Sequence, residues 1–360
     1  MNATQRGTLG RVWKDISDEK WSDWVWQLKN RIHTIPQLAE MLGKSPESLV
    51  GHVEVTNRYP VCITPYYFSL MNLEDENDPV RLQCFPDARE IHFSVGGVQD
   101  PLEEERNMPV PGLIHRYRDR CVTIMTNVCM THCRHCNRKR MWGNEEWAGN
   151  GQHLRGMIDY IEKTKAIREV IISGGDPLTL HEEILTRFIV SLRFISHVEV
   201  LRIGSRVPVV MPMRVTPSLC SMLRGNRPLW FITQFNHPIE ITEESAGACE
   251  MLLNAGIPVL NQSVLLRGIN DNYETMRDLL YGLEKISVKP YYLFQCDAVE
   301  GTDHFRADIL KGIEIMEKLW ENMPGLCIPQ YVLDIPGQGG KVPLFPCSHP
   351  SAKCGTGFRD

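Results

Sequence analysis

The sequence predicts an α/β fold, a partial barrel made of six strand–helix units around a parallel sheet. Two observations carry this prediction. From about residue 118 onward, short runs rich in β-branched and aromatic residues alternate with amphipathic helical segments. Polar clusters also follow the ends of the expected strands, where barrel enzymes place their functional residues. Six units are too few for a closed eight-stranded barrel, so we expect an incomplete, TIM-like (β/α)6 barrel.

The expected strands are short apolar runs of the kind that parallel sheets bury on both faces. They cover residues 121–126, 168–173, 197–204, 228–235, 258–266 and 289–296. The expected helices between and after them cover residues 154–166, 182–195, 217–225, 243–256 and 272–286, each with apolar residues at helical spacing.

The N-terminal part of the chain has a different pattern. In DISDEKWSDWVWQLKNRI, Ser17 or Asp18 is the expected N-cap, and Trp21, Trp24 and Leu28 fall on one helical face. Pro36 can begin a second short helix. Residues 73–110 are rich in Asp, Glu and Pro, which is typical of loops. We therefore divide the chain into an N-terminal helical region and linker (1–110), a barrel (111–320) and a C-terminal segment (321–360).

Charge and hydropathy exclude several classes of protein. A formal net charge of -5 leaves no basic excess for general binding to nucleic acid or to a membrane surface. No apolar run approaches the roughly 18 residues that cross a bilayer. The first residues, MNATQRGTLGRVWKD, lack the apolar core of an export signal. We expect a cytoplasmic protein whose cysteines are thiols or metal ligands, not disulfides.

Most of the twelve cysteines stand alone in apolar surroundings and are expected to be small buried hydrophobes. These are Cys62, Cys84, Cys121, Cys220, Cys249, Cys296 and Cys327. Cys347 and Cys354 are seven residues apart, which is wider than the usual spacing of a metal-binding pair.

The remaining cysteines form the pattern Cys129-x3-Cys133-x2-Cys136 within one short loop. A structural zinc site needs four ligands, and although His132 or His135 could be the fourth, no second Cys/His pair follows at finger spacing. Three thiolates suit a [4Fe–4S] cluster that binds one ligand per iron. The fourth iron would then be free to bind a substrate or cofactor and pass an electron to it.

The three-cysteine motif resembles that of the radical S-adenosylmethionine (SAM) enzymes. The segment SGGDP, at residues 173–177, matches that family's Gly-Gly segment, in which Gly174 and Gly175 are expected to let the backbone approach the ligand amine. Over nearly the whole chain, from DISDEKWSDWVWQLKNRI through PVPGLIHRYRDR, CRHCNRKR, RIGSRVPVV, FNHPIEITEES, NQSVLLRGIND and PYYLFQCD to GQGGKVP, the sequence resembles the lysine 2,3-aminomutase family.

This resemblance implies three cofactors and a set of site residues. The cofactors are a [4Fe–4S] cluster on Cys129, Cys133 and Cys136, SAM, and pyridoxal 5'-phosphate (PLP). Lys341, after a Gly-rich stretch, matches the catalytic lysine that forms a Schiff base with PLP. The other expected cofactor-binding residues are Arg116 and Arg120 for PLP, and Ser173, Gly174, Gly175, Asp176, Ser205, Arg206, His237 and Gln262 for SAM.

The resemblance also implies how substrate binds. Arg138 matches the arginine that holds the α-carboxylate, and Asp297 and Asp334 match the two aspartates that hold the side-chain ammonium. A buried ammonium is costly unless carboxylates pair with it, so two acids favour a cationic side chain. Arginine would satisfy the same charges.

The implied activity is an isomerase reaction that moves the α-amino group of L-lysine to Cβ through a 5'-deoxyadenosyl radical, giving β-lysine. The implied partners are a small electron donor such as flavodoxin or ferredoxin, and other copies of the chain in a homo-oligomer. Asn272 stands where longer family members carry a zinc-binding cysteine, so we expect no zinc between subunits.

Three alternatives remain open from the sequence. The same cofactors could act on arginine or another cationic amino acid, as an aminomutase or a desaturase, because a shared site does not fix the reaction. A protein-bound lysine could be the substrate. The third alternative is a non-enzymatic, zinc-stabilised binding module that uses Cys129, Cys133, Cys136 and His135.

Overall fold

The computed structural model describes residues 10–13, 15–92, 96–143, 151–337 and 340–344 of the 360-residue chain. Its centre is a nine-stranded sheet in which the strands follow one another in chain order. The strands are β1 (Leu113–Tyr117), β2 (Arg120–Ile124), β3 (Glu169–Ser173), β4 (Val200–Gly204), β5 (Leu229–Thr233), β6 (Val259–Leu265), β7 (Lys289–Gln295), β8 (Gln330–Ile335) and β9 (Gly340–Pro343).

Strands β2 to β8 are parallel, and the antiparallel strands β1 and β9 form the two edges. No ladder joins β1 to β9 within the described part of the chain, so the barrel is open there. The six strands expected from the sequence are β2 to β7, and the partial-barrel prediction is confirmed. Sequence analysis had not identified β1, β8 or β9 as strands, and β8 and β9 carry residues of the 321–360 segment into the same sheet.

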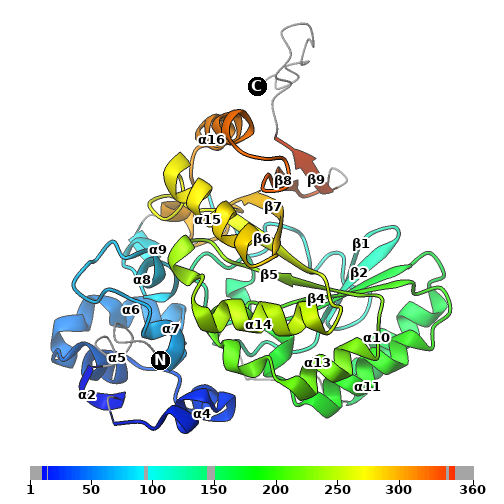
Figure 1. Ribbon diagram of the computed structural model, residues 1–360, viewed down its shortest axis with the longest axis horizontal. Coiled ribbons are helices and arrows are strands. Elements are labelled where there is room, and N and C mark those ends of the chain that lie inside the picture. Colours follow the sequence, from blue (N-terminus) through cyan, green and yellow to red (C-terminus); the bar gives the residue numbers. More distant parts are fainter. Residues whose placement is uncertain (1–9, 14, 93–95, 144–150, 338–339, 345–360) are drawn as a thin grey trace, which may run out of the picture.

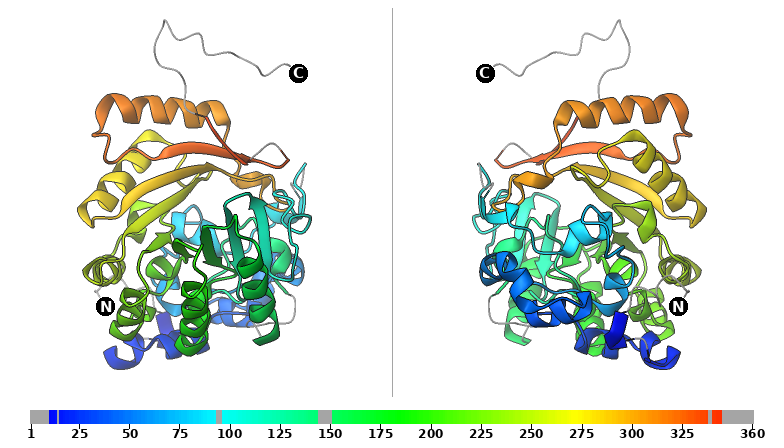
Figure 2. Two further views of the ribbon diagram at one scale, coloured as in Figure 1. Left: turned by 90° about the vertical axis from the view of Figure 1, so that its right-hand side faces the viewer. Right: turned by 90° about the vertical axis from the view of Figure 1, so that its left-hand side faces the viewer.

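The helices that connect the strands cover the outer side of the sheet (Figure 1). They are α10 (Gly151–Lys163), α11 (Glu182–Arg193), α12 (Val207–Val210), α13 (Pro217–Arg224), α14 (Glu243–Asn254), α15 (Tyr273–Lys285) and α16 (Ile309–Asn322). Each of the longer helices buries an apolar stripe, such as Leu185, Phe188 and Leu192 of α11. Figure 2 shows the curvature of the sheet with these helices on its outer side.

The N-terminal region is helical, as predicted, and forms a group beside the sheet (Figure 1). Its helices are α2 (Gly10–Trp13), α3 (Asp18–Ser22), α4 (Trp24–Lys29), α5 (Ile35–Leu42), α6 (Val50–Arg58), α7 (Pro65–Phe68), α8 (Pro79–Cys84) and α9 (Arg89–His92). Ser17 is the N-cap of α3. The expected single helix breaks at Asp23, because this residue ends α3 and its side chain caps α4.

Short 3-10 helices complete the fold at Pro46–Leu49 (η1), Lys139–Met141 (η2), Pro177–Thr179 (η3), Pro212–Arg214 (η4), Pro238–Glu240 (η5) and Asp303–Phe305 (η6). One large apolar core joins the sheet, its helices and the N-terminal region. The seven isolated cysteines are all buried, as expected, whereas Cys347 and Cys354 lie outside the described residues. None of the described helices has the length and apolar content needed to span a membrane.

Candidate active site

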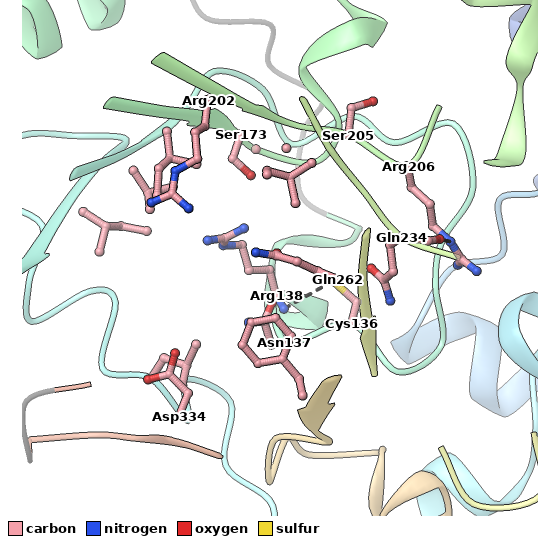
Figure 3. Close-up of a pocket in the computed structure, with 18 of the residues that line it drawn as sticks. Cys136, Asn137, Arg138, Ser173, Arg202, Ser205, Arg206, Gln234, Gln262 and Asp334 are labelled. Atoms are coloured by element: carbon pink, nitrogen blue, oxygen red, sulfur yellow. Dashed lines mark hydrogen bonds between the residues drawn. The ribbon is translucent and has the colours of Figure 1, made fainter. Parts of the chain in front are cut away.

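A cavity of about 730 Å³ lies within the curve of the sheet. Figure 3 shows side chains from separate loops and strands around this common space. Nearly all residues expected to be functional contribute to its wall: Cys129, Cys133, Cys136, Arg116, Arg120, Arg138, Ser173, Gly174, Gly175, Asp176, Ser205, Arg206, Gln262, Asp297, Asp334 and Lys341. His237 is the exception, because its Nδ1 accepts a hydrogen bond from the backbone of Ile239 and caps η5.

The three motif cysteines follow β2 on one tight loop, in which the Cys136 backbone N–H donates to the Cys133 carbonyl. Burial raises the pKa of Cys136 to about 11 and also raises that of Cys129. These thiols therefore ionise readily only when a cation such as iron compensates the charge. Two N–H groups already point at the sulfurs: Arg206 Nη1 lies 2.8 Å from Cys133 Sγ, and the Arg138 backbone N lies 3.3 Å from Cys136 Sγ.

A single zinc ion would need four ligands gathered around one point. Throughout the described ranges, no three His, Cys, Asp or Glu side chains are placed to hold one metal ion. His135, the suggested fourth ligand, instead lies 2.9 Å from the amide nitrogen of Gln234 through its Nε2. Three separate thiols on the wall of a large cavity fit a cluster with one cysteine per iron better than one tetrahedral ion.

The N-terminal region holds the cysteine loop in place through a buried acid, Glu90 of α9. Glu90 pairs with Arg134 and Lys139, at 2.6 Å in each case, and all three side chains are almost fully buried. Burial alone favours the neutral acid, but the two cations together hold the pKa of Glu90 below its usual value. Breaking a buried ionic network of this kind is strongly destabilising. The sequence pattern gave no signal for this role of Glu90.

The Gly-Gly segment after β3 packs closely on the cysteine loop. A Cβ on Gly174 would lie 2.5 Å from the Thr126 carbonyl oxygen, and one on Gly175 would lie 2.3 Å from the Val128 carbonyl oxygen. The backbone of both glycines therefore packs on the cysteine loop with no room for a Cβ, a constraint that the sequence had not indicated. Hydrogen bonds from the backbone N–H groups of Gly175 and Asp176 join the same two segments.

Asp176 and Ser205 join the loops that follow β3 and β4. Ser205 Oγ donates to Asp176 at 2.8 Å, and the Asp176 carboxylate also accepts from the backbone of Arg206 at 2.9 Å and of Leu178 at 3.0 Å. Burial raises the pKa of Asp176 to about 6 against the effect of these hydrogen bonds. The carboxylate therefore orders two loops of the cavity wall through hydrogen bonds with the Ser205 hydroxyl and with backbone N–H groups.

Lys341 and Asp334 are paired neighbours on strands β9 and β8. Their side chains meet at 3.2 Å, and Arg116 of β1 binds the other carboxylate oxygen of Asp334 at 2.7 Å. The two edge strands thus bring the expected PLP lysine, a PLP arginine and a substrate-binding aspartate together. Asp334 therefore has two cationic partners in the structure, an arrangement that the sequence had not indicated.

Asp297, just beyond β7, differs from Asp334 because the described residues give it no cationic hydrogen-bond partner. Its carboxylate accepts a hydrogen bond from the Asn137 side-chain amide at 3.4 Å. Burial raises the pKa of Asp297 to about 7, and the nearby Asp334 carboxylate adds to the rise. A buried carboxylate in this state favours a cationic ligand, which would restore its charged form.

Arg138 extends from the cysteine loop into the cavity (Figure 3). Its Nε and Nη2 donate to both oxygens of Glu104, at 2.7–3.0 Å. Glu104 comes from the acidic loop before β1, which the sequence analysis assigned only to a linker. This contact is a second functional candidate that the sequence pattern did not reveal.

Three further residues on the cavity wall have buried polar atoms without a hydrogen-bond partner among the described residues. They are Tyr117 and Thr233, through their hydroxyls, and His135, through its Nδ1. Such atoms are rare in folded proteins, so each suggests a bound group that supplies the missing contact. The Arg120 guanidinium lies 3.8 Å from the centre of the Tyr117 ring and pairs with Asp119.

Comparison with known proteins agrees with this site. Residues 123–280, which include the three cysteines and the Gly-Gly segment, match the model of the Radical SAM superfamily. The chain is 48% identical to an L-lysine 2,3-aminomutase of Acetoanaerobium sticklandii, over 93% of this chain and 81% of that protein. It is 47% identical to an L-lysine 2,3-aminomutase of Clostridium subterminale, over 93% and 80%.

A glutamate 2,3-aminomutase of Clostridioides difficile is also similar, with 41% identity over 92% of this chain and 78% of that protein. The similarity to the first of these relatives spans 336 residues of this chain, far more than the barrel alone. From its sequence and from the geometry of its site, the chain belongs to the lysine 2,3-aminomutase family of radical SAM enzymes.

Proposed function

We propose that this protein moves the α-amino group of L-lysine to Cβ and so produces β-lysine. The observation that carries the proposal is the content of one cavity: three cluster-type cysteines, a lysine and an arginine that both pair with Asp334, and the buried acid Asp297, which has no cationic hydrogen-bond partner among the described residues. The first two features suit the cofactors, and the third suits a substrate with a positively charged side chain. Two relatives named as L-lysine 2,3-aminomutases support the same conclusion.

The residues on the cavity wall fit the three cofactors. A [4Fe–4S] cluster would be held by Cys129, Cys133 and Cys136. SAM would be surrounded by the loops at Gly175 and Ser205 and by the side chain of Gln262. PLP would be bound covalently by Lys341, with Arg116 and Arg120 near its phosphate. The cluster and SAM together supply hydrogen-atom abstraction, and PLP supplies an aldehyde for the migrating amino group. The protein supplies orientation and exclusion of water.

The remaining groups position the amino acid. Arg138 would bind the α-carboxylate, because a guanidinium offers paired donors that match two carboxylate oxygens. Asp297 would bind the side-chain ammonium, which restores its ionised form. Asp334, which pairs with Lys341 and Arg116, would be the second acid at this end of the cavity. The glutamate-acting relative would not need two acids at this end of the cavity.

The proposal extends to partners. A small electron carrier such as flavodoxin or ferredoxin would reduce the cluster, and the enzyme would act as a homo-oligomer. Both follow from the family resemblance. They can be tested by replacing dithionite with the purified carrier and by measuring mass in solution.

The decisive experiment is anaerobic incubation of the reconstituted enzyme with SAM, PLP, dithionite and one amino acid at a time. L-Lysine should give β-lysine, identified by mass and NMR, while L-arginine and L-glutamate should be converted at least about a hundredfold more slowly, because each mismatches the buried acids in size or charge. The Cys136→Ala variant is the control and should be inactive. Conversion of arginine in preference to lysine would refute the proposal.

Lysine binding should strengthen as pH rises from about 6 to 8. In the substrate-free protein the pKa of Asp297 is about 7, so at lower pH the acid is protonated and must lose its proton before it can pair with the ammonium. The sign follows from linkage: a bound cation favours the ionised acid, so affinity falls up to about tenfold for each pH unit below 7.

Norleucine, which has the length of lysine without the ammonium, is the matched ligand. The ratio of lysine affinity to norleucine affinity, measured from the PLP absorbance at each pH, should rise from pH 6 to 8. The Asp297→Asn substitution should abolish this rise. A ratio that stays constant from pH 6 to 8 would contradict this role for Asp297.

A further inference from the structure

The Glu104–Arg138 contact has a definite geometry. A guanidinium has two edges that can each bind a carboxylate, a side edge formed by Nε and Nη2 and an end edge formed by Nη1 and Nη2. Glu104 occupies the side edge, with Nε 3.0 Å from both oxygens and Nη2 2.7 Å from Oε1. No Arg138 Nη1 contact occurs within the described parts of the chain, so the end edge keeps its donors.

Glu104 is itself fixed. Its side chain is almost fully buried, and Arg140 Nη2 donates to its second oxygen at 2.9 Å. Arg140 also pairs with Asp100 and Glu105 of the same acidic loop, so the loop is attached to the cysteine segment at several points. Burial opposes ionisation of Glu104, but Arg138 and Arg140 hold its pKa below the usual value.

We propose that Glu104 is a positioning residue for substrate: it fixes the plane of Arg138 so that the α-carboxylate binds only the end edge. This inference rests on the proposed function, in which Arg138 receives the carboxylate. With Glu104 in place, the Arg138 guanidinium is already paired before substrate binds, and the donors of its end edge keep one orientation. Without Glu104 the guanidinium can rotate about its side-chain bonds. Substrate binding must then fix its orientation, which lowers affinity.

The alternative is that Glu104 competes with substrate, because its carboxylate binds the same arginine, Arg138, that the substrate carboxylate needs. The two roles predict opposite results. A competitor occupies the donors that substrate uses, so its removal would lower the KM for lysine. Glu104 leaves the end edge open and has a second anchor in Arg140, so displacement is unnecessary and removal should raise KM.

The test compares Glu104→Gln with Glu105→Gln. Glutamine keeps the shape but faces Arg138 with an amide donor at one position. Glu105 is the matched control, because it is the next residue, its side chain is 72% exposed, and it contacts Arg140 but not Arg138. We expect Glu104→Gln to raise the KM for lysine about ten- to a hundredfold, with a smaller effect on kcat, and Glu105→Gln to behave as wild type.

Two further readouts separate local from general damage. Iron content and the PLP absorption of Glu104→Gln should equal those of wild type. Inhibition by cadaverine, which keeps both amines of lysine but lacks the carboxylate, should be equally strong in both proteins. An unchanged or lower KM in Glu104→Gln would overturn the inference, as would an equal loss of cadaverine inhibition.

The proposed function can fail separately. If wild-type enzyme makes no β-lysine, that function is refuted, while lysine binding followed through PLP absorbance still reports whether Glu104 orders Arg138. If β-lysine forms and Glu104→Gln binds lysine normally, only the role of Glu104 is refuted.

Discussion

Replacing Lys341 by alanine should remove the covalent PLP link and lower the rate of β-lysine formation by roughly three orders of magnitude or more. Lys341 is the only lysine on the cavity wall within the described ranges. Its partners, Asp334 at 3.2 Å and the rings of Tyr117 and Phe294, would be left without their cation. Borohydride reduction followed by mass spectrometry should find PLP on the wild-type chain and none on the variant.

Two controls distinguish covalent chemistry from charge. Lys341→Arg keeps a cation beside Asp334 but cannot form the link, so it should be as inactive as the alanine variant. Lys311→Ala removes a half-exposed lysine of α16 that pairs with Asp271, and it should behave as wild type. PLP that remains attached to the Lys341→Ala chain after reduction would show that another lysine carries the coenzyme.

The second large effect concerns stability. Gly175→Ala should lower the free energy of unfolding by about 3 kcal/mol or more, because overpacking against backbone has few routes of relief. The added Cβ would lie 2.3 Å from the Val128 carbonyl oxygen and 2.7 Å from the Asn127 carbonyl carbon. Since these residues precede Cys129, the distortion should also reduce iron incorporation.

Gly247→Ala is the matched control for this substitution. Gly247 lies inside α14, and a Cβ there meets no atom within 4 Å. Because alanine is a better helix former than glycine, the control should gain about 0.5–1 kcal/mol. Thermal unfolding of the metal-free proteins, together with iron per chain after reconstitution, measures both effects. A Gly175→Ala protein as stable as wild type would refute the packing role of this glycine.

The sequence was informative wherever function depends on residues close together in the chain. Three cysteines within eight positions, Cys129 to Cys136, predicted a cluster loop, and the alternation of strands and helices predicted the partial barrel. The resemblance to a known family located Lys341, Arg138, Asp297 and others. All of these lie on one cavity wall, whereas His237, which was expected near SAM, caps a 3-10 helix.

Interactions between distant segments could not be predicted in this way. Glu90 is more than forty residues from the arginine that it binds, and Glu104 is 34 residues from Arg138. Acidic residues in a loop-rich region give the same sequence pattern whether they are solvated or buried in ion pairs. The packing of Gly175 on the cysteine loop could not be predicted either, because the direction of a missing Cβ is known only when the opposite segment is in place.

The sequence by itself determined which chemical groups the chain can offer. The short spacing of three cysteines indicated the cluster, and the family resemblance indicated the coenzyme lysine and the acids for a cationic substrate. Only the tertiary structure decided how these groups are used. It paired Asp334 with two cations, gave Asp297 no cationic hydrogen-bond partner in the part of the chain that the structure describes, and placed Glu104 on one edge of Arg138. Such differences arise from burial and from the neighbouring charged side chains, and both are set when distant strands and loops meet in one cavity.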